Sequence, residues 1–249
     1  MPRFFITASD IEGAENEKLI RIRGDDASHI SRVLRMKPGE HITACDMRGC
    51  EYETVILQTG NEVLLKVHSE KESDNEPPYK AVVYQALVKG DRFDTVLQKS
   101  TELGASDIVP VITSRCTVKL TESEYSKKVE RWQKIVREAS KQCGRAIIPK
   151  VHNPMKFSDA LHTASEADLP LFCYEGDGTS PLGVIAESVA NPGSVSVMIG
   201  PEGGYSVEEA EAASKAGMKM TGLGKRILRT ETASLFVLSF ISCRYELQK

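Results

Sequence analysis

The sequence predicts an α/β protein in which a small β-rich N-terminal domain precedes a larger domain with a mainly parallel sheet. Short strand candidates separated by turn residues fill about the first 70 residues. Beyond them apolar runs alternate with helical segments, a pattern typical of a parallel sheet covered on both faces. A polar stretch that ends in two prolines separates the two patterns and indicates a domain boundary.

The N-terminal strand candidates are Leu19–Arg23, His41–Cys45, Tyr52–Leu57 and Glu62–Val67. One helix is expected between the first two of them. Asp26 can cap this helix, and Ile30, Val33 and Leu34 form its apolar stripe. Lys37, Pro38 and Gly39 then end the helix and turn the chain into the next strand.

The stretch Glu70–Pro78 contains no apolar residue of core type, so we interpret it as a linker. The expected domains are therefore residues 1–72 and 80–249, joined by residues 73–79. In the second domain we expect strands over residues 81–88, 108–112, 169–173, 195–199 and 218–221. The expected helices are residues 92–103, 122–142, 181–189, 207–216 and 231–246. The last of these is apolar on nearly all sides, which predicts burial all round, inside its own core or in a homodimer interface.

The composition is that of an ordinary globular protein, with 41% hydrophobic residues, 27% charged residues and a net charge of −3, which excludes a disordered chain. The six cysteines are scattered without a CxxC pair, so we expect neither a metal site nor a disulfide framework, and a reducing cytoplasm fits best. The first residues lack a basic region followed by an apolar one, and no apolar run approaches the length of a membrane span, so we expect neither export nor membrane insertion.

The charge is unevenly distributed along the chain. Residues 80–150 carry 14 Lys and Arg against 8 Asp and Glu, whereas the stretches before and after them are acidic. A basic zone of this kind fits contact with a polyanion, and a solvated helix face rich in lysine fits it equally well.

A glycine-rich loop, Gly200–Gly204, follows the apolar run Val195–Ile199, and Ser206 with Glu209 then forms a capping box for the next helix. Glycines at the end of a parallel strand let a ligand approach backbone amides. The spacing matches neither the dinucleotide fingerprint nor the P-loop. Glu202 would repel a pyrophosphate, so a neutral or cationic ligand such as S-adenosylmethionine suits the loop better. The alternative is a tight turn without a ligand.

Two further loops follow strand candidates. The stretch Gly222–Ala233 brings glycines, three basic residues and a helix N-terminus together, which would stabilise an anion through backbone amides and Arg229. In the alternative interpretation Thr230 caps the helix and the basic residues are solvated. The stretch Phe172–Gly178 supplies glycine beside carboxylates. All three loops would lie along one edge of the sheet, where ligand crevices form.

Ile199–Gly204 and Leu223–Ala233, in this order, resemble the SPOUT RNA methyltransferases of the RsmE type. The resemblance covers essentially the whole chain and includes the segments Pro2–Phe4, His29–Arg35, Lys99–Gly104, Trp132–Ile135 and Gln142–Arg145. It implies methylation of N3 of a uracil in 16S ribosomal RNA, within the 30S subunit. It also implies a PUA-like N-terminal β-barrel, a trefoil knot around S-adenosylmethionine in the C-terminal domain, and a homodimer.

The resemblance also assigns residues to the cofactor site by position. These are Tyr174, Glu175, Ile199, Gly200, Pro201, Glu202, Gly203, Gly204, Leu223, Gly224, Ile227, Leu228, Arg229, Thr230 and Thr232. For the chemistry, uracil N3 must lose a proton, so Arg229 is expected to stabilise the anion and Glu202 or Glu231 to act as the base. The candidates for RNA phosphate contacts are Arg3, Arg32, Arg35, Arg92, Lys99, Lys134, Lys141 and Arg145.

Two functions of other classes compete with this hypothesis. A non-catalytic RNA-binding protein would bind RNA without any need for S-adenosylmethionine. A nicotinamide-dependent dehydrogenase would need a glycine fingerprint after its first strand, and Val88–Arg92 does not supply it.

Overall fold

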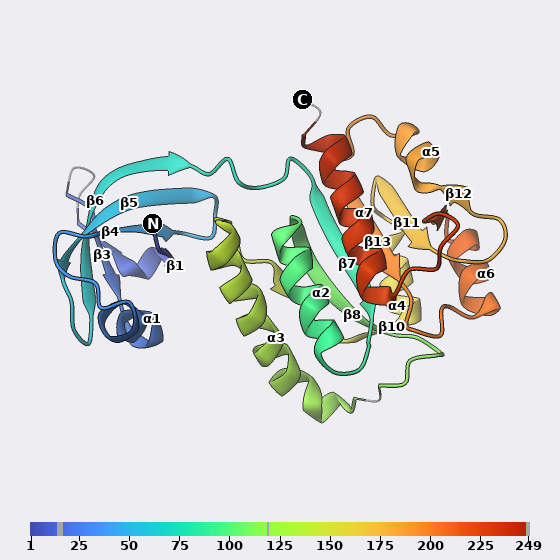
Figure 1. Cartoon of the computed structure of the whole chain (residues 1–249), viewed down its shortest axis with the longest axis horizontal. Helices are drawn as coiled ribbons and strands as arrows, with labels where there is room; N and C mark the ends of the chain where they lie inside the picture. The colour runs from blue at the N-terminus through green and yellow to red at the C-terminus, as the bar shows by residue number, and fades with distance from the viewer. Residues whose placement is uncertain (14–16, 119, 248–249) are drawn as a thin grey trace. The chain divides into compact units, whose positions relative to one another are not determined.

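The structure, a computed structural model, describes residues 1–13, 17–118 and 120–247 (Figure 1). The chain divides into two compact units. The first comprises Met1–Glu76 together with Ser140–Ile148, and the second comprises Pro77–Ala139 together with Pro149–Lys249. A segment that starts at the end of a long helix therefore belongs to the first unit, which the sequence pattern does not anticipate.

The first unit contains a six-stranded sheet in the order β1-β4-β5-β6-β3-β2. Its strands are β1 (Arg3–Phe5), β2 (Ile11–Glu12), β3 (Leu19–Ile22), β4 (His41–Cys45), β5 (Cys50–Gln58) and β6 (Val63–Glu72). Pairing is antiparallel except between β1 and β4. Phe4, Ile20, Ile42 and Leu65 are buried in its core. All four predicted strands are confirmed.

The polar residues 70–72, expected in the linker, instead continue strand β6. Glu72 pairs with Cys50, Lys71 with Glu51 and Glu70 with Tyr52. Residues 68–72 of this strand are all exposed, so polar side chains there do not prevent backbone pairing.

The expected helix after β3 differs from the prediction. The chain forms α1 (Gly24–Ser28) and then a π-helical turn, η2 (His29–Val33). Asp26 does not cap it, because the helix begins two residues earlier. Ile30 is buried, but Val33 is 66% and Leu34 41% exposed. A π-helical turn has more residues per turn than an α-helix, so the predicted stripe does not stay on one face.

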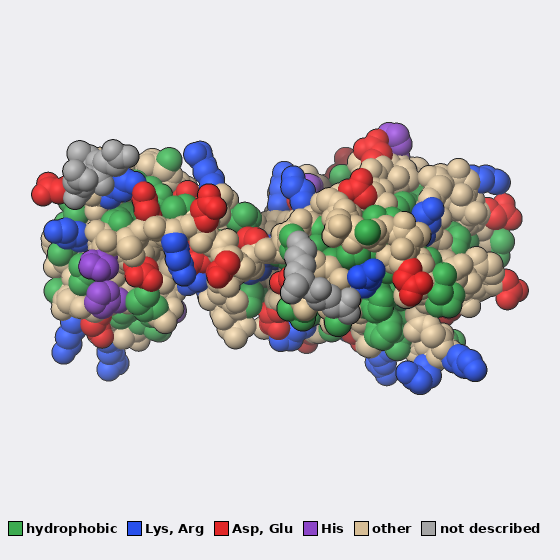
Figure 2. All heavy atoms as spheres, turned by 90° about the horizontal axis from the view of Figure 1, so that it is seen from above, with side chains coloured by type: hydrophobic (Ala, Val, Ile, Leu, Met, Phe, Trp, Pro, Cys, Tyr) green, Lys and Arg blue, Asp and Glu red, His purple; other side chains and the backbone are tan. Residues whose placement is uncertain are grey.

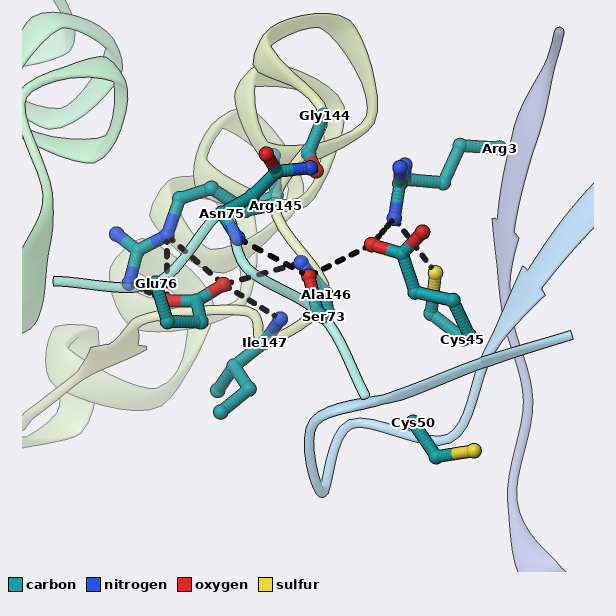
Figure 3. Close-up of polar contacts among 12 residues, drawn as sticks. Arg3, Cys45, Cys50, Ser73, Asn75, Glu76, Gly144, Arg145, Ala146 and Ile147 are labelled. Atoms are coloured by element: carbon teal, nitrogen blue, oxygen red, sulfur yellow. Dashed lines mark hydrogen bonds and ion pairs between the residues drawn. The ribbon is translucent and has the colours of Figure 1, made fainter. Parts of the chain in front are cut away.

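A polar cluster fixes Ser140–Ile148 to the rest of the first unit (Figure 3). The Glu76 carboxylate accepts hydrogen bonds from Nη2 of Arg145 at 2.6 Å and from the backbone amides of Ala146 and Ile147 at 3.0 and 3.1 Å. Nδ2 of Asn75 donates to the Gly144 carbonyl at 3.0 Å. These contacts make the segment part of the first unit.

The second unit is built on a parallel sheet in the order β10-β8-β7-β13-β11-β14-β12, with β9 beside β8. Its strands are β7 (Lys80–Ala86), β8 (Ala105–Ile112), β9 (Lys150–Val151), β10 (Met155–Lys156), β11 (Leu169–Cys173), β12 (Ser180–Pro181), β13 (Ser194–Ile199) and β14 (Lys219–Gly222). Its helices are α2 (Asp91–Glu102), α3 (Glu122–Cys143, whose last turn belongs to the first unit), α4 (Phe157–Ala164), α5 (Leu182–Glu187), α6 (Val207–Lys215) and α7 (Thr230–Tyr245). The predicted parallel sheet is confirmed, while the threading of the chain into a knot stays a prediction.

Helices cover this sheet on both faces. Helices α4 and α6 pack on the face that carries Tyr84, Phe172 and Met198, and α7 lies beside α2 and against β13 (Figure 1). Helix α4 was not predicted, because eight residues are too short for a clear helical period. Basic and acidic side chains are interspersed on the visible face of each unit (Figure 2).

Helix α7 is not buried all round within its own chain, so its expected complete burial in a homodimer interface stays a prediction. Val237 and Ile241 are fully buried, whereas Phe236 is 45% exposed in the single chain. One stripe of an otherwise buried apolar helix is thus left open.

Candidate functional site

The carboxyl ends of three neighbouring strands lie level at one edge of the parallel sheet. Cys173 at the end of β11 pairs with Ile199 at the end of β13 and with Thr221 in β14. The three glycine-containing loops that the sequence singled out follow these strand ends. A pocket of about 510 Å³ lies among them, which is the size range of small-molecule and cofactor sites.

The pocket lining brings together most of the predicted site residues. Those that line it are Tyr174, Glu175, Ile199, Gly200, Pro201, Glu202, Gly204, Leu223, Gly224, Ile227, Leu228, Arg229, Thr230 and Glu231. Gly203 and Thr232 lie outside the lining although their neighbours belong to it. Arg92, from the start of α2, also lines the pocket.

The glycine loop after β13 has little room for side chains. A Cβ on Gly200 would lie 3.2 Å from the ring of Tyr205. This ring is stacked on the ring of Phe172, with 4.2 Å between the ring centroids. Gly204 has a φ of +66°, and a Cβ there would lie 3.0 Å from Oε1 of Glu175. Glycine at these two positions lets the loop fold tightly at the edge of the pocket.

The capping box predicted after this loop is confirmed. The Glu209 amide donates to Oγ of Ser206 at 3.2 Å, and the Ser206 amide donates to Oε2 of Glu209 at 2.9 Å. Oε1 of Glu209 also accepts from the amide of Ser114 at 2.8 Å. The box therefore ties the start of α6 to the loop that follows β8.

That loop supplies a residue that sequence reasoning missed. Nη1 of Arg115 donates to the carbonyl oxygen of Gly203 at 3.0 Å, so Arg115 supports the glycine loop from outside the pocket. Its place directly after an apolar strand, on the same edge as the other loops, was the available signal.

The charges in the pocket differ from the expected picture at Glu202. Nη1 of Arg92 lies 2.7 Å from Oε1 of Glu202 and both side chains are partly exposed. The Arg92 charge offsets the carboxylate, so the argument that Glu202 alone repels phosphates is wrong. This ion pair also engages the Arg92 guanidinium, which the sequence assigned to RNA.

Arg229 and Glu231 stand on either side of the first residue of α7. Arg229 is the exposed N-cap residue, and no ion pair of its side chain occurs among the described residues. Glu231 lies in the first turn, and its Oε2 is buried without a hydrogen-bond partner in the described part of the chain. Arg229 and Glu231 thus both line one pocket, and the buried Oε2 of Glu231 has no hydrogen-bond partner among the described residues.

Three of the predicted RNA contacts are engaged in ion pairs inside the first unit. Arg3 pairs with Glu51 at 2.7 Å and Lys141 with Asp26 at 2.9 Å. Arg145 is 4% exposed and is held by Glu76.

The other predicted RNA contacts lie on the surface. Arg32 and Arg35 are exposed beside η2. In the second unit Lys99 pairs with Glu102 and Lys134 with Glu130, both at 2.8 Å.

The described residues contain neither a metal-binding cluster nor a membrane-spanning helix. No cluster of three His, Cys, Asp or Glu side chains arranged to hold a metal ion occurs there. Likewise, none of the described helices has the length and apolar character needed to cross a membrane.

Both units of the chain are similar to known protein domains. An RNA methyltransferase domain model matches residues 75–242, and an RNA methyltransferase PUA domain model matches residues 22–67. The ribosomal RNA small subunit methyltransferase E of Bacillus subtilis is 35% identical over 99% of this chain and 98% of its own length.

Solved structures agree over the same length. The methyltransferase E of Neisseria gonorrhoeae bound to S-adenosyl methionine has a TM-score of 0.84 and 32% identity, and covers 98% of each chain. A methyltransferase from Legionella pneumophila, in complex with the cofactor, has a TM-score of 0.85 and 31% identity over 97% of this chain and 96% of its own. With both domain models and full-length relatives in agreement, the chain belongs to the RNA methyltransferase family, among the ribosomal RNA small subunit methyltransferases E.

Proposed function

We propose that the protein transfers a methyl group from S-adenosylmethionine to N3 of a uridine in 16S ribosomal RNA. The observation that carries the proposal is the pocket at the carboxyl edge of β11, β13 and β14, which is lined by both Arg229 and Glu231. The family supplies the expectation of the cofactor and of the RNA.

The residues of the pocket fit this cofactor. The tight backbone at Gly200 and Gly204 leaves main-chain groups accessible to the adenosine part of a ligand. Two carboxylates in the lining besides the ion-paired Glu202, Glu175 and Glu231, suit a ligand that carries a positive sulfonium. The sequence-assigned residues that line the pocket would hold the cofactor, and the cofactor would supply an electrophilic methyl group.

The chain's own residues would prepare the nucleophile. Uracil N3 carries a proton at neutral pH, so a base or a stabilising cation is needed. Glu231 lines the pocket, and its buried Oε2 has no protein partner among the described residues, so we assign the role of the base to Glu231. Arg229 and the N-terminal amides of α7 would stabilise the negative charge on the uracil carbonyl oxygens. Glu202 is the weaker candidate for the base, because its carboxylate forms an ion pair with Arg92.

The RNA would contact exposed basic side chains. Arg32 and Arg35 flank the exposed Val33 and Leu34 at η2, which offers cations and an apolar surface together. Lys99, Lys134 and Arg92 are the candidates in the second unit. The 30S subunit is the proposed form of the substrate, because the target base must leave its stack and assembled RNA can present it unpaired. The cytoplasm is the proposed location.

The functional form is proposed to be a homodimer. Phe236 on α7 and Ile227 in the loop before it are 45% and 82% exposed. A second copy of the chain would remove this apolar surface from water.

The proposed activity is tested with 30S subunits that lack the modification. We expect transfer of labelled methyl groups to 16S RNA, and mass spectrometry of the nucleosides to find N3-methyluridine. S-adenosylhomocysteine should bind in a calorimetric titration. RNA binding without any cofactor binding would contradict the proposal and favour the non-catalytic RNA-binding function.

A further inference from the structure

Gln85 is a polar residue in the middle of the apolar parallel sheet. It lies in β7, between β8 and β13, and is fully buried. Its Nε2 donates to Oγ1 of Thr230 at 2.8 Å, and Oγ1 of Thr230 donates to the carbonyl oxygen of Gly200 at 2.6 Å. These two hydrogen bonds join three segments that are far apart in the sequence. We call them the Gln85–Thr230–Gly200 relay.

The donor and the acceptor in each hydrogen bond of this relay follow from the single proton of the Thr230 hydroxyl. The Thr230 hydroxyl has one proton, which is given to Gly200, so toward Gln85 the hydroxyl can only accept. The atom that faces it must therefore be the amide nitrogen. This nitrogen also donates to the Ala86 carbonyl at 3.3 Å, where an amide oxygen would be repelled. The relay thus runs from Gln85 through Thr230 to Gly200.

Two of the three members of the relay, Thr230 and Gly200, lie in the pocket lining. Gly200 begins the glycine loop, and Thr230 is the first residue of α7, directly after Arg229. With its proton committed to Gly200, Thr230 fixes the start of the glycine loop against the start of α7. The hydroxyl proton is consequently unavailable to a ligand.

Stability does not explain why a glutamine stands at this position. Oε1 of Gln85 is buried and has no hydrogen-bond partner among the described residues. A buried acceptor without a partner destabilises the folded state, and an apolar side chain of similar length would avoid that loss. Departures from such packing rules are expected at functional sites.

We propose that Gln85 is a positioning residue for methyl transfer. Through the Thr230 hydroxyl it holds the Gly200 loop and the N-terminus of α7, and with them Arg229, in the geometry that the reaction needs. This inference rests on the proposed function. Sequence reasoning missed Gln85, although one amide within the apolar run 81–88 was a visible signal.

The test compares Gln85→Met, Thr230→Val and the double variant with Gln133→Met as a matched control. Gln133 is a glutamine of the same unit whose amide bonds to backbone groups, donating to the Pro149 carbonyl at 2.8 Å and accepting from the Val151 amide at 2.9 Å. It lies outside the pocket lining. Three quantities are measured: affinity for S-adenosylhomocysteine, kcat and KM with 30S subunits, and the melting temperature.

For Gln85→Met we expect kcat to fall about tenfold to a hundredfold, as for a small misplacement of reacting groups, with KM for the subunit nearly unchanged. Its affinity for S-adenosylhomocysteine should fall about threefold or more, while the melting temperature stays equal or rises. Added to Thr230→Val, the Gln85 change should have little further effect, because both act through one hydroxyl. Thr230→Ser, which keeps the hydroxyl, should lose less than Thr230→Val. Gln133→Met should lower the melting temperature without lowering kcat.

The proposal is overturned if Gln85→Met keeps wild-type affinity and kcat, or if its losses add fully to those of Thr230→Val. A melting temperature that falls in step with activity, as in a merely structural role, would also overturn it. If the wild-type protein does not methylate the subunit, the proposed function fails. The calorimetric comparison of the single and double variants then still decides whether the relay shapes the pocket.

Discussion

Arg92 and Glu202 form an ion pair in the lining of the pocket, with Nη1 of the arginine 2.7 Å from Oε1 of the glutamate. The pair joins the start of α2 to the glycine loop after β13. It also distinguishes the two candidate bases, because Glu231 has an oxygen without any such partner among the described residues.

We therefore expect Glu231→Gln to reduce kcat far more than Glu202→Gln. Loss of a general base lowers the rate by about 10²- to 10⁴-fold, whereas loss of a partly exposed ion pair should alter the rate by about tenfold or less. Single-turnover methylation of 30S subunits measures both. Rates that fall equally in the two variants would contradict the assignment of the base to Glu231.

Arg229 is expected to act on the charge that develops on the base. It is exposed at the N-terminus of α7, where the backbone amides also favour negative charge. Arg229→Ala should lower kcat by about 10²- to 10³-fold, as for the loss of one oxyanion donor, and Arg229→Lys by less. Affinity for S-adenosylhomocysteine and the melting temperature serve as controls. A variant that folds, binds cofactor and turns over normally would rule out this role.

The sequence predicts most of the fold and much of the site because local pattern determines these features. The apolar runs that became β11 and β13 are buried by the sheet itself, and the Ser206 capping box needs only neighbours in sequence. Contacts between distant segments leave no such pattern. The ion pairs of Arg145 with Glu76 and of Arg92 with Glu202 depend on tertiary folding. The sequence alone therefore does not distinguish these arginines from unpaired surface charges.

A buried ion pair in the first unit predicts a pH dependence of stability. Arg3 and Ser73 both donate to Oε1 of Glu51 at 2.7 Å. Burial alone would raise the pKa of Glu51, but these hydrogen bonds and the Arg3 charge outweigh burial and lower the pKa below its usual value. A lowered carboxyl pKa stabilises the folded state at neutral pH, and the stabilisation is lost as the pH falls through the folded-state pKa.

Glu51→Gln should accordingly lower the free energy of unfolding near pH 7 by about 2 kcal/mol, the size of a hydrogen bond to a charged group. The difference from the wild type should shrink in acid, where Glu51 is protonated in the native protein. Urea unfolding at several pH values measures this difference. A gap that stays constant with pH would contradict the role of the charge.

The first unit offers a matched test of the RNA surface. Arg35 is exposed, whereas Arg145 is buried against Glu76. Arg35→Ala and Arg32→Ala should each reduce the salt slope of RNA binding by about 1, the effect of losing one phosphate contact. Arg145→Ala should lower the free energy of unfolding by about 3 kcal/mol, because it leaves the partly buried Glu76 without its cation. Unchanged slopes for Arg32 and Arg35 would move the RNA surface elsewhere.

The exposed stripe of α7 predicts self-association. Phe236 is 45% exposed, whereas Val237, Leu238 and Ile241 on the same helix are buried in the same chain. Phe236→Asp should convert a dimer to a monomer in sedimentation equilibrium, because a charge placed in an apolar interface is desolvated without a partner. Val184→Asp is the control, since Val184 is 58% exposed on α5, on a different helix. A wild-type protein that sediments as a monomer at micromolar concentration would refute the dimer, and equal effects of the two substitutions would remove α7 from its interface.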